Sequence, residues 1–219
     1  MSNSCILVAG GNGSRMGTEV PKQFLLIKGI PVLMHTIRNF CDFDPSLQLI
    51  LVLPENELIN WESLCQFHDF KIPHQLIAGG DTRFQSVKNG LSLVLDSDLI
   101  AVHDGVRPLV SHETLTRCFN CAAENGAAIP VLPANESVRE GNMHESVPVD
   151  RSRYFMVQTP QVFKASILRE GYQQSWIPEF TDDASVVEHA GVPVHLVTGN
   201  RENIKITFPE DLRIAELFL

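Results

Sequence analysis

The sequence of 219 residues lacks several features that mark common protein classes. It contains no run of about 18 apolar residues, so we expect no helix that crosses a membrane. It carries 17 Lys and Arg against 26 Asp and Glu, a formal net charge of −9. Duplex binding depends on neutralising many phosphates, so this balance argues against nucleic acid as a partner. A basic region followed by a signal peptide is also missing, and we expect a cytoplasmic protein.

Cysteine is scarce and scattered. The five cysteines are an odd number, and only Cys118 and Cys121 show the C-x-x-C spacing. No second pair accompanies them to complete a zinc site. We therefore interpret the cysteines as plain reduced thiols.

Two common phosphate-binding loops are absent. The Rossmann fingerprint G-x-G-x-x-G would begin at Gly11 and needs a glycine where the chain has Met16. The Walker A loop needs Gly-Lys followed by Ser or Thr, and this tripeptide does not occur. These two standard nucleotide-binding motifs are therefore excluded.

The chain instead has a different glycine-rich segment, LVAGGNGSRMGTEVPKQF at residues 7–24. Its glycines and its cations are Gly10, Gly11, Gly13, Gly17, Arg15 and Lys22. Glycines let a backbone turn sharply so that its N–H groups can face a polyphosphate, and cations supply the matching charge. An ordinary glycine-rich turn is the alternative, but a cation in the rigid PKQF turn favours a nucleotide site.

Short apolar runs alternate with helical patterns along the chain. The runs are rich in Ile, Leu and Val and read as strands buried on both faces, at residues 5–9, 47–53, 75–78, 100–103 and 127–132. Helical patterns lie at residues 32–40, 55–67, 83–95 and 112–124. Gly126 is expected to cap the last of these helices. The alternation predicts an α/β fold with a mostly parallel sheet in three layers.

The pattern changes after Pro133. Residues 134–154 are polar, with strand-like pieces at 136–139 and 145–149, which predicts a hairpin-like arm that projects from the sheet. Regular structure resumes at residues 158–163. We then expect helices at 165–175 and 182–190, strands at 194–197 and 204–207, and a last helix that opens with Pro209.

Polar residues lie at the ends of several expected elements. Asp104 follows the strand at residues 100–103 and could hold a divalent metal ion or a sugar hydroxyl, or could be a turn aspartate that bonds its own backbone. We interpret His103 beside it as structural. Asp81 precedes the helix at residues 83–95, where it could read a base edge or serve as the N-cap.

Four more polar residues have a plain structural alternative. Lys205 lies inside an apolar segment, where a lysine is rarely without a role unless it snorkels to the rim. Arg151 lies just past the arm, where a solvated surface arginine is the default. Thr181 and Asp182 by default form a helix cap.

Taken together, seven segments resemble one family. They read AGGNGSRMG…PKQF, GGDTRFQSV, HDGVRP, VDR, QTPQVF, TDDAS and ENIKIT…PEDL, in the order and spacing of the 2-C-methyl-D-erythritol 4-phosphate cytidylyltransferases. The resemblance covers essentially the whole chain, residues 1–219, as one nucleotidyltransferase domain. It implies a three-layer, Rossmann-like nucleotidyltransferase fold with a mostly parallel sheet and a protruding β-arm at about residues 134–154.

The resemblance also implies an activity and partners. The reaction joins 2-C-methyl-D-erythritol 4-phosphate to CTP, giving 4-diphosphocytidyl-2-C-methyl-D-erythritol and pyrophosphate with Mg²⁺ or another divalent cation. The protein would be a homodimer built through the arm, so that Arg151 acts on the neighbour's site. A phosphate nucleophile is already ionised at neutral pH, so the chemistry needs fixed cations more than a strong base.

Individual roles follow from the same resemblance. Arg15 and Lys22 would stabilise charge on the α-phosphate, and Arg151 and Lys205 would position the attacking phosphate. The CTP-binding residues would be Ala9, Gly10, Gly11, Gly13, Gly80, Asp81, Ser86 and Asp104. The residues that bind the alcohol phosphate would be Arg107, Ser137, Thr159 and Thr181. Asp104 is also the candidate metal ligand.

Two alternatives to this enzyme stay open at this point, and a third fails. A ribitol-5-phosphate cytidylyltransferase would share the PKQF, HDxVRP and QTPQ features, whereas VDR before Gln158 and TDDAS favour the methylerythritol enzyme. A non-catalytic nucleotide-binding regulator could dispense with the four cations, Arg15, Lys22, Arg151 and Lys205, but all four are present. A Rossmann oxidoreductase fails because Met16 stands where its fingerprint needs glycine. Two positions depart from the family pattern: Ser137 stands where threonine is frequent, and Gly105-Val106 stand where many members have two alanines.

Overall fold

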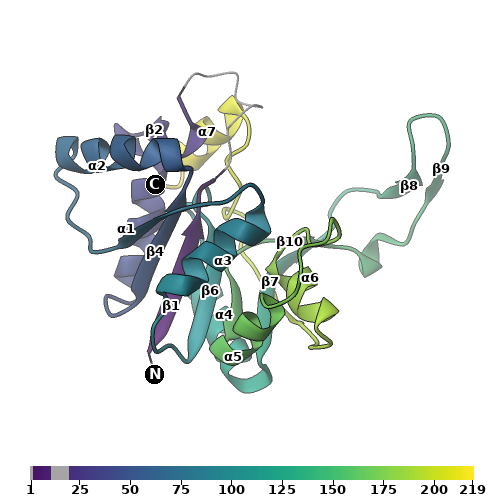
Figure 1. Cartoon of the computed structure of the whole chain (residues 1–219). Coiled ribbons are helices and arrows are strands. Elements are labelled where there is room, and N and C mark those ends of the chain that lie inside the picture. Colours follow the sequence, from purple (N-terminus) through teal and green to yellow (C-terminus); the bar gives the residue numbers. More distant parts are fainter. Residues whose placement is uncertain (1, 11–19) are drawn as a thin grey trace.

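A twisted sheet forms the centre of the computed structural model, which describes residues 2–10 and 20–219 (Figure 1). Its main path, from edge to edge, is β10-β7-β11-β6-β1-β4-β5, and β12 pairs with β7 as well. The strands are β1 (Asn3–Val8), β4 (Gln48–Leu53), β5 (Gln75–Ala78), β6 (Leu99–Asp104), β7 (Ala127–Pro133), β10 (Phe155–Val157), β11 (Gln161–Lys164) and β12 (His195–Thr198).

Most neighbouring strands run parallel. The pairs β6/β1, β1/β4, β4/β5 and β7/β12 are parallel, whereas β11 runs antiparallel to both β6 and β7, and β10 runs antiparallel to β7. The chain leaves β7 into the arm and returns directly as β10 and β11, so these strands come back in the opposite direction. The expected mostly parallel sheet is confirmed.

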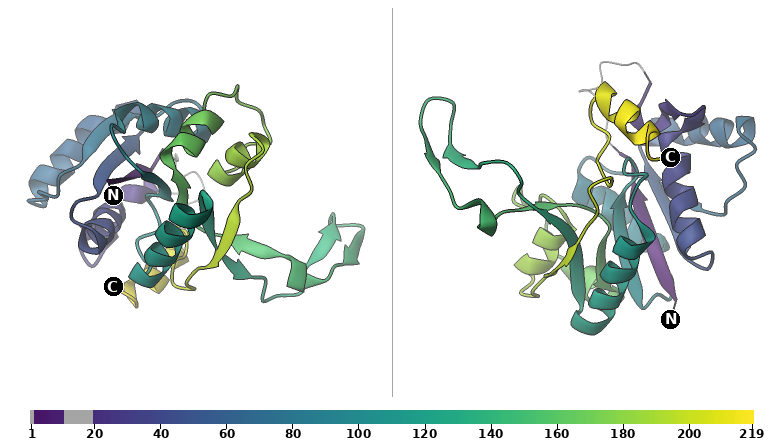
Figure 2. Two further views of the ribbon diagram at one scale, coloured as in Figure 1. Left: turned by 90° about the horizontal axis from the view of Figure 1, so that it is seen from below. Right: turned by 180° about the vertical axis from the view of Figure 1, so that it is seen from behind.

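Helices cover both faces of the sheet and complete three layers (Figures 1 and 2). One face packs against α1 (Val32–Phe43), α2 (Leu58–Phe67) and α4 (His112–Asn125), and the other against α3 (Arg83–Leu93), α5 (Ala165–Gly171) and α6 (Asp183–His189). Within β1, Cys5 and Leu7 join the first core and Ile6 joins the second, as the two-residue period of a strand requires. Burial on both faces explains the unbroken apolar runs.

Two helix ends match their sequence signals. Gly126 caps α4 with a φ of 98°, a conformation that favours glycine. Helix α7 (Pro209–Glu216) has proline in its first turn. None of the helices in the described part of the chain is both long and apolar enough to cross a membrane.

Residues 204–207 were expected to form a strand, and this expectation is wrong. They have no strand partner in the described sheet, and the backbone N–H of Ile206 donates to the Val106 carbonyl at 3.0 Å. Ile206 is fully buried in a small cluster with Ile27, Val32 and Val106. Burial in this small cluster, rather than pairing with another strand, explains the apolar pattern of residues 204–207. Sequence reasoning also missed the hairpin of β2 (Leu26–Ile27) and β3 (Ile30–Pro31).

The arm projects from the sheet, as Figure 2 shows. Its tip is an antiparallel hairpin of β8 (Arg139–Gly141) and β9 (Ser146–Pro148), followed by a short 3₁₀ turn, η4 (Arg151–Arg153). All residues of β8 and β9 are exposed. The predicted protruding β-arm is confirmed, although β8 begins three residues later than the strand-like piece in the sequence.

Candidate active site

A cavity of about 290 Å³ lies where β1 and β6 end side by side. Val8 at the end of β1 is in register with Asp104 at the end of β6, so the loops that follow both strands face the same space. Open α/β sheets bind ligands at such strand ends. The cavity brings together eight of the residues selected from the sequence: Ala9, Gly10, Lys22, Gly80, Asp81, Ser86, Asp104 and Lys205.

Asp104 is the charged centre of this cavity. Its Oδ2 accepts a hydrogen bond from Arg107 Nε at 3.0 Å and lies 3.1 Å from Lys205 Nζ. Burial alone would raise the pKa of the Asp104 carboxyl, but Lys205, Arg107 and Arg83 together hold this pKa well below its usual range. Both contacts are to cationic side chains, so the carboxylate stays ionised and fixes these cations by charge.

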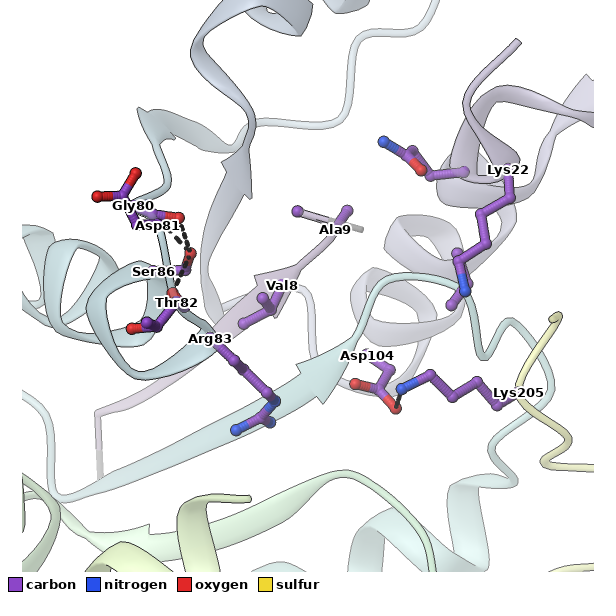
Figure 3. A pocket seen from close by; sticks show the side chains of 13 residues that line it. Val8, Ala9, Lys22, Gly80, Asp81, Thr82, Arg83, Ser86, Asp104 and Lys205 are labelled. Carbon is purple, nitrogen blue, oxygen red and sulfur yellow. Dashed lines mark hydrogen bonds and ion pairs between the residues drawn. The ribbon is translucent and has the colours of Figure 1, made fainter. Parts of the chain in front are cut away.

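Lys22, from the N-terminal part of the chain, lies on the same side of the cavity as Lys205 (Figure 3). It belongs to a 3₁₀ turn, η2 (Lys22–Phe24), and its Nζ donates to the Ile206 carbonyl at 3.2 Å. This bond ties the PKQF turn to the segment that carries Lys205, and Figure 3 shows both lysines on one side of the cavity. Three further residues of the predicted phosphate loop, Gly11, Gly13 and Arg15, lie outside the described residues.

The opposite side is a tight loop before α3 (Figure 3). Ser86 Oγ accepts a hydrogen bond from the Gly80 N–H at 3.1 Å and donates to the Thr82 carbonyl at 2.9 Å. A Cβ at Gly80 would clash with the Gln85 side chain, so only glycine fits this close approach. Ser86 and Gly80 therefore shape the loop that presents Asp81.

The interpretation of Asp81 as the N-cap of α3 is wrong. Thr82 is the N-cap, and its Oγ1 accepts from the Gln85 N–H at 3.0 Å. Asp81 lies one residue earlier, is exposed, and lines the cavity. Its carboxylate is therefore not used to cap the helix, which favours the reading in which it contacts a ligand.

Arg83 also lines the cavity, although sequence reasoning gave it no role. Its Nη2 donates to Oδ2 of the fully buried Asp183 at 2.6 Å, and Tyr172 donates to the other carboxylate oxygen at 2.6 Å. Burial would lower the pKa of Arg83, but Asp183 outweighs it and raises that pKa above its usual value. The GGDTRF and TDDAS segments each supply one partner, but no local pattern in the sequence could pair them.

A buried chain of hydrogen bonds through Thr159 and His103 holds the backbone on either side of Asp104. Thr159 Oγ1 accepts from the Asp104 N–H at 3.1 Å and lies 3.1 Å from His103 Nδ1, and His103 Nε2 lies 2.9 Å from the Arg107 carbonyl. Because a carbonyl only accepts, Nε2 carries the hydrogen and Nδ1 accepts from Thr159. Burial lowers the pKa of His103 to about 4. A neutral histidine thus holds Thr159 and Arg107 around the carboxylate, in agreement with its structural interpretation.

Five predicted residues within the described ranges do not line this cavity: Arg107, Ser137, Arg151, Thr159 and Thr181. Arg107 and Thr159 lie beside Asp104 in the wall behind it. Ser137 and Arg151 are exposed on the arm, where Arg151 Nη1 donates to the Asn135 carbonyl. Thr181 is exposed just before α6, and Asp182 forms the N-cap of that helix with a capping box to Ser185. One chain therefore brings eight of the predicted residues to the cavity and leaves Ser137, Arg151 and Thr181 apart from it.

The residues fit a metal ion that arrives with the substrate. In the described ranges, 2–10 and 20–219, no group of three or more His, Cys, Asp or Glu side chains is placed to hold a metal. Asp104 offers one carboxylate at the cavity wall. Mg²⁺ usually keeps several waters and binds one or two carboxylates together with substrate phosphates, so one carboxylate is sufficient.

A mostly parallel sheet with cations, a glycine-containing loop and a buried carboxylate at its strand ends defines a nucleotide-binding α/β enzyme. The model of the 2-C-methyl-D-erythritol 4-phosphate cytidylyltransferase family matches residues 4–219. A relative of that name from Bacteroides thetaiotaomicron is 52% identical over the full length of both chains. The chain therefore belongs to this family.

Solved structures agree with this assignment. The 2-C-methyl-D-erythritol 4-phosphate cytidylyltransferase from Thermus thermophilus is 30% identical, with a TM-score of 0.80 over 100% of this chain and 98% of that one. The 4-diphosphocytidyl-2C-methyl-D-erythritol synthase from Anaerococcus prevotii is 25% identical, with a TM-score of 0.83 over 99% and 95% of the two chains.

The chain is thus a nucleotidyltransferase. It transfers a cytidylyl group from CTP to 2-C-methyl-D-erythritol 4-phosphate, giving 4-diphosphocytidyl-2-C-methyl-D-erythritol and pyrophosphate. The family match supports this reaction over the ribitol 5-phosphate enzyme, the non-catalytic regulator and the oxidoreductase.

Proposed function

We propose that the cavity bounded by Lys22 and Lys205 on one side and by the loop before α3 on the other is the active site of this cytidylyl transfer. We call the side on which Lys22 and Lys205 lie the lysine wall (Figure 3). The observation that carries the proposal is the convergence of Lys22, Lys205 and Asp104 with Asp81 and Ser86 around one space (Figure 3). Two anionic reactants must meet at the α-phosphorus of CTP. Cations held in fixed positions lower their repulsion without a cost of reorganisation during the reaction.

The cytosine would lie against the loop of Gly80, Asp81 and Ser86. Cytosine carries an exocyclic amino group, which is a hydrogen-bond donor that a carboxylate accepts well. Asp81 is exposed at the cavity and is not the cap of α3. The backbone of the same loop is held by Ser86, so it can offer further hydrogen bonds in a fixed geometry.

The phosphates would then extend past Ala9 and Gly10 toward Lys22. Lys22 would stabilise the charge that develops on the α-phosphate, and Lys205, fixed by Asp104, would orient the attacking phosphate. Gly11, Gly13 and Arg15 would complete the phosphate site. Mg²⁺ or another divalent cation, when bound, would neutralise charge on the triphosphate, with Asp104 as its protein ligand.

The alcohol phosphate would be bound by Arg107 and Thr159, together with Thr181 and, on the arm, Ser137. Arg107 is anchored on Asp104 and donates from Nη1 to the Asn203 carbonyl at 2.8 Å, and Thr159 supports the Asp104 backbone. These bonds set the shape of the wall beneath Lys205.

The arm at about residues 134–154 would join two copies of the chain. Apolar side chains at its base are strongly exposed, with Phe155 at 46%, Met156 at 63% and Val157 at 43%. Contiguous exposed apolar surface favours contact with another protein surface. In such a homodimer Arg151 would reach the neighbour's site and position the attacking phosphate there. A cytoplasmic location and the absence of nucleic-acid and membrane partners stay predictions from the sequence.

The reaction can be tested with purified protein, CTP and Mg²⁺ by following the release of pyrophosphate. We expect turnover with 2-C-methyl-D-erythritol 4-phosphate to exceed that with ribitol 5-phosphate. Preferred turnover of ribitol 5-phosphate would contradict the assignment. The same assay with UTP in place of CTP tests whether Asp81 reads the base, since uracil has an oxygen where cytosine has its amino group.

A further inference from the structure

Gln23 lines the cavity as a buried amide that forms no side-chain hydrogen bond with residues 2–10 or 20–219. Its side chain is 1% exposed, and neither Nε2 nor Oε1 has a partner within the described part of the chain. Buried amides almost always have partners, because an unpaired donor or acceptor loses its bonds to water and gains nothing in return. A leucine of similar size would avoid this loss.

Gln161 shows what an equally buried glutamine does in the same protein. It is also 1% exposed, but its Nε2 donates to Asp182 Oδ2 at 2.8 Å and its Oε1 accepts from the Ala184 N–H at 2.8 Å. Gln161 therefore joins the start of α6 to the sheet. The unused amide of Gln23 has no comparable structural purpose, and it borders the space that a ligand would fill.

The position of Gln23 indicates which part of the ligand it meets. It is the residue after Lys22 in the turn η2 and lines the same cavity, and Lys22 lies across that cavity from Asp81 and Ser86 (Figure 3). We propose that Gln23 is a CTP-contacting residue whose Nε2 donates a hydrogen bond to a phosphoryl oxygen of the triphosphate. Its Oε1 then accepts from a water molecule ordered in the same complex. This inference depends on the proposed placement of the phosphates beside Lys22.

A ligand role and a structural role make opposite predictions for an apolar substitution. If the amide serves CTP, Gln23→Leu removes an unsatisfied group from the free protein and removes a bond from the complex. The free protein should then become more stable while CTP binds more weakly. If the amide binds a trapped water in the free protein instead, the substitution should lower stability and leave CTP affinity unchanged.

The test is calorimetric titration of Gln23→Leu with CTP and Mg²⁺ in the absence of the alcohol phosphate, so that no turnover occurs. We expect the Kd for CTP to rise roughly 10- to 100-fold, as for the loss of a hydrogen bond to a charged group. The Kd for cytidine, which has no phosphate, should stay within about 3-fold of the original value. An unchanged Kd for CTP, or an equal loss for both ligands, would overturn the proposal.

Thermal unfolding of the free protein gives the second readout. Gln23→Leu should raise Tm by roughly 2 to 6 °C, and the matched control Gln161→Leu should lower it, because the control breaks two formed bonds. A fall in Tm for Gln23→Leu would contradict the ligand role. Should this variant fail to fold, Gln23→Met, which is unbranched and of the same length, is put through the same titrations and judged by the same outcomes.

The failure of this inference can be separated from failure of the proposed site. Lys22→Ala should also weaken CTP if the phosphates lie beside η2. If Lys22→Ala weakens CTP and Gln23→Leu does not, the site stands and the role of Gln23 is wrong. If neither variant changes CTP affinity, the placement of the phosphates itself is wrong.

Discussion

The cluster around Asp104 and the arm are built in opposite ways. Asp104, Arg107 and His103 are buried or nearly so, and each is held by bonds from other parts of the chain. The arm strands β8 and β9 are exposed, as is β10 at the base of the arm, and the hairpin is joined mainly to itself. One region is fixed by its own fold. The other is exposed, and we infer that it gains a fixed place only against a second surface, as in the proposed homodimer.

The largest effect is expected at the lysine wall. Lys22→Ala should lower kcat by roughly 10²- to 10³-fold, about 3–4 kcal/mol, because a fixed charge would be lost where negative charge develops. Steady-state kinetics with both substrates measures this effect. The control is Lys71→Ala, which should leave kcat unchanged. Lys71 is 80% exposed, and within the described part of the chain its salt bridge is with Asp69. An effect confined to KM would show that Lys22 binds substrate without acting in the transition state.

Mixing subunits tests whether the arm completes the neighbour's site. Arg151→Ala and Lys22→Ala should each be nearly inactive alone if Arg151 acts across the dimer. Random mixing then yields one intact site in half of the dimers, so activity should recover to about a quarter of the original. The formation of mixed dimers is checked with two affinity tags. Mixed dimers without any recovery would place Arg151 in its own subunit's site.

The buried cluster should make stability depend on pH through His103. Its pKa is about 4 in the folded protein, below the usual 6.5, so the unfolded chain binds more protons between these values. Stability should therefore be complete above pH 6.5 and fall by about 3 kcal/mol as the pH drops to 4. Urea unfolding of the original protein and of His103→Asn across this range measures the difference. Equal slopes for both proteins would mean that His103 is not neutral and buried.

Substitutions of the exposed apolar residues at the base of the arm should weaken dimer association and hardly change the stability of the single chain. Phe155→Ser with Met156→Ser should weaken the dimer in sedimentation experiments, while the unfolding free energy of the single chain changes by no more than about 0.5 kcal/mol. Ile59→Ser removes an apolar side chain that is 77% exposed on α2, away from the arm (Figure 1), and is the matched control. Equal dimer affinities for all three proteins would argue against association through the arm.

The regular part of the fold could be predicted because its signals are local. Strands buried on both faces are continuous apolar runs, and β5 was placed with its observed bounds. Residues 204–207 show the limit of this reasoning. The sequence of an apolar segment does not show whether the segment joins a sheet or fills a small cluster beside α7, as Ile206 does.

Eight residues that line the candidate site were selected from their motifs, while the contacts that they make were not predicted. Asp81 and Thr82 are both good N-cap residues, and only the backbone conformation shows that Thr82 takes this position. The pairing of Arg83 with Asp183 joins residues a hundred positions apart, which no local pattern reveals. The burial of Gln23 without a partner among the described residues is likewise a property of the folded cavity.

A crystal structure of the protein with CTP and Mg²⁺ would show directly whether the cavity binds the nucleotide. We expect the triphosphate in the cavity, with a phosphoryl oxygen at hydrogen-bond distance from Lys22 Nζ and the cytosine amino group at the same distance from the Asp81 carboxylate. A nucleotide bound elsewhere, or one bound with its base against the lysine wall, would contradict this expectation.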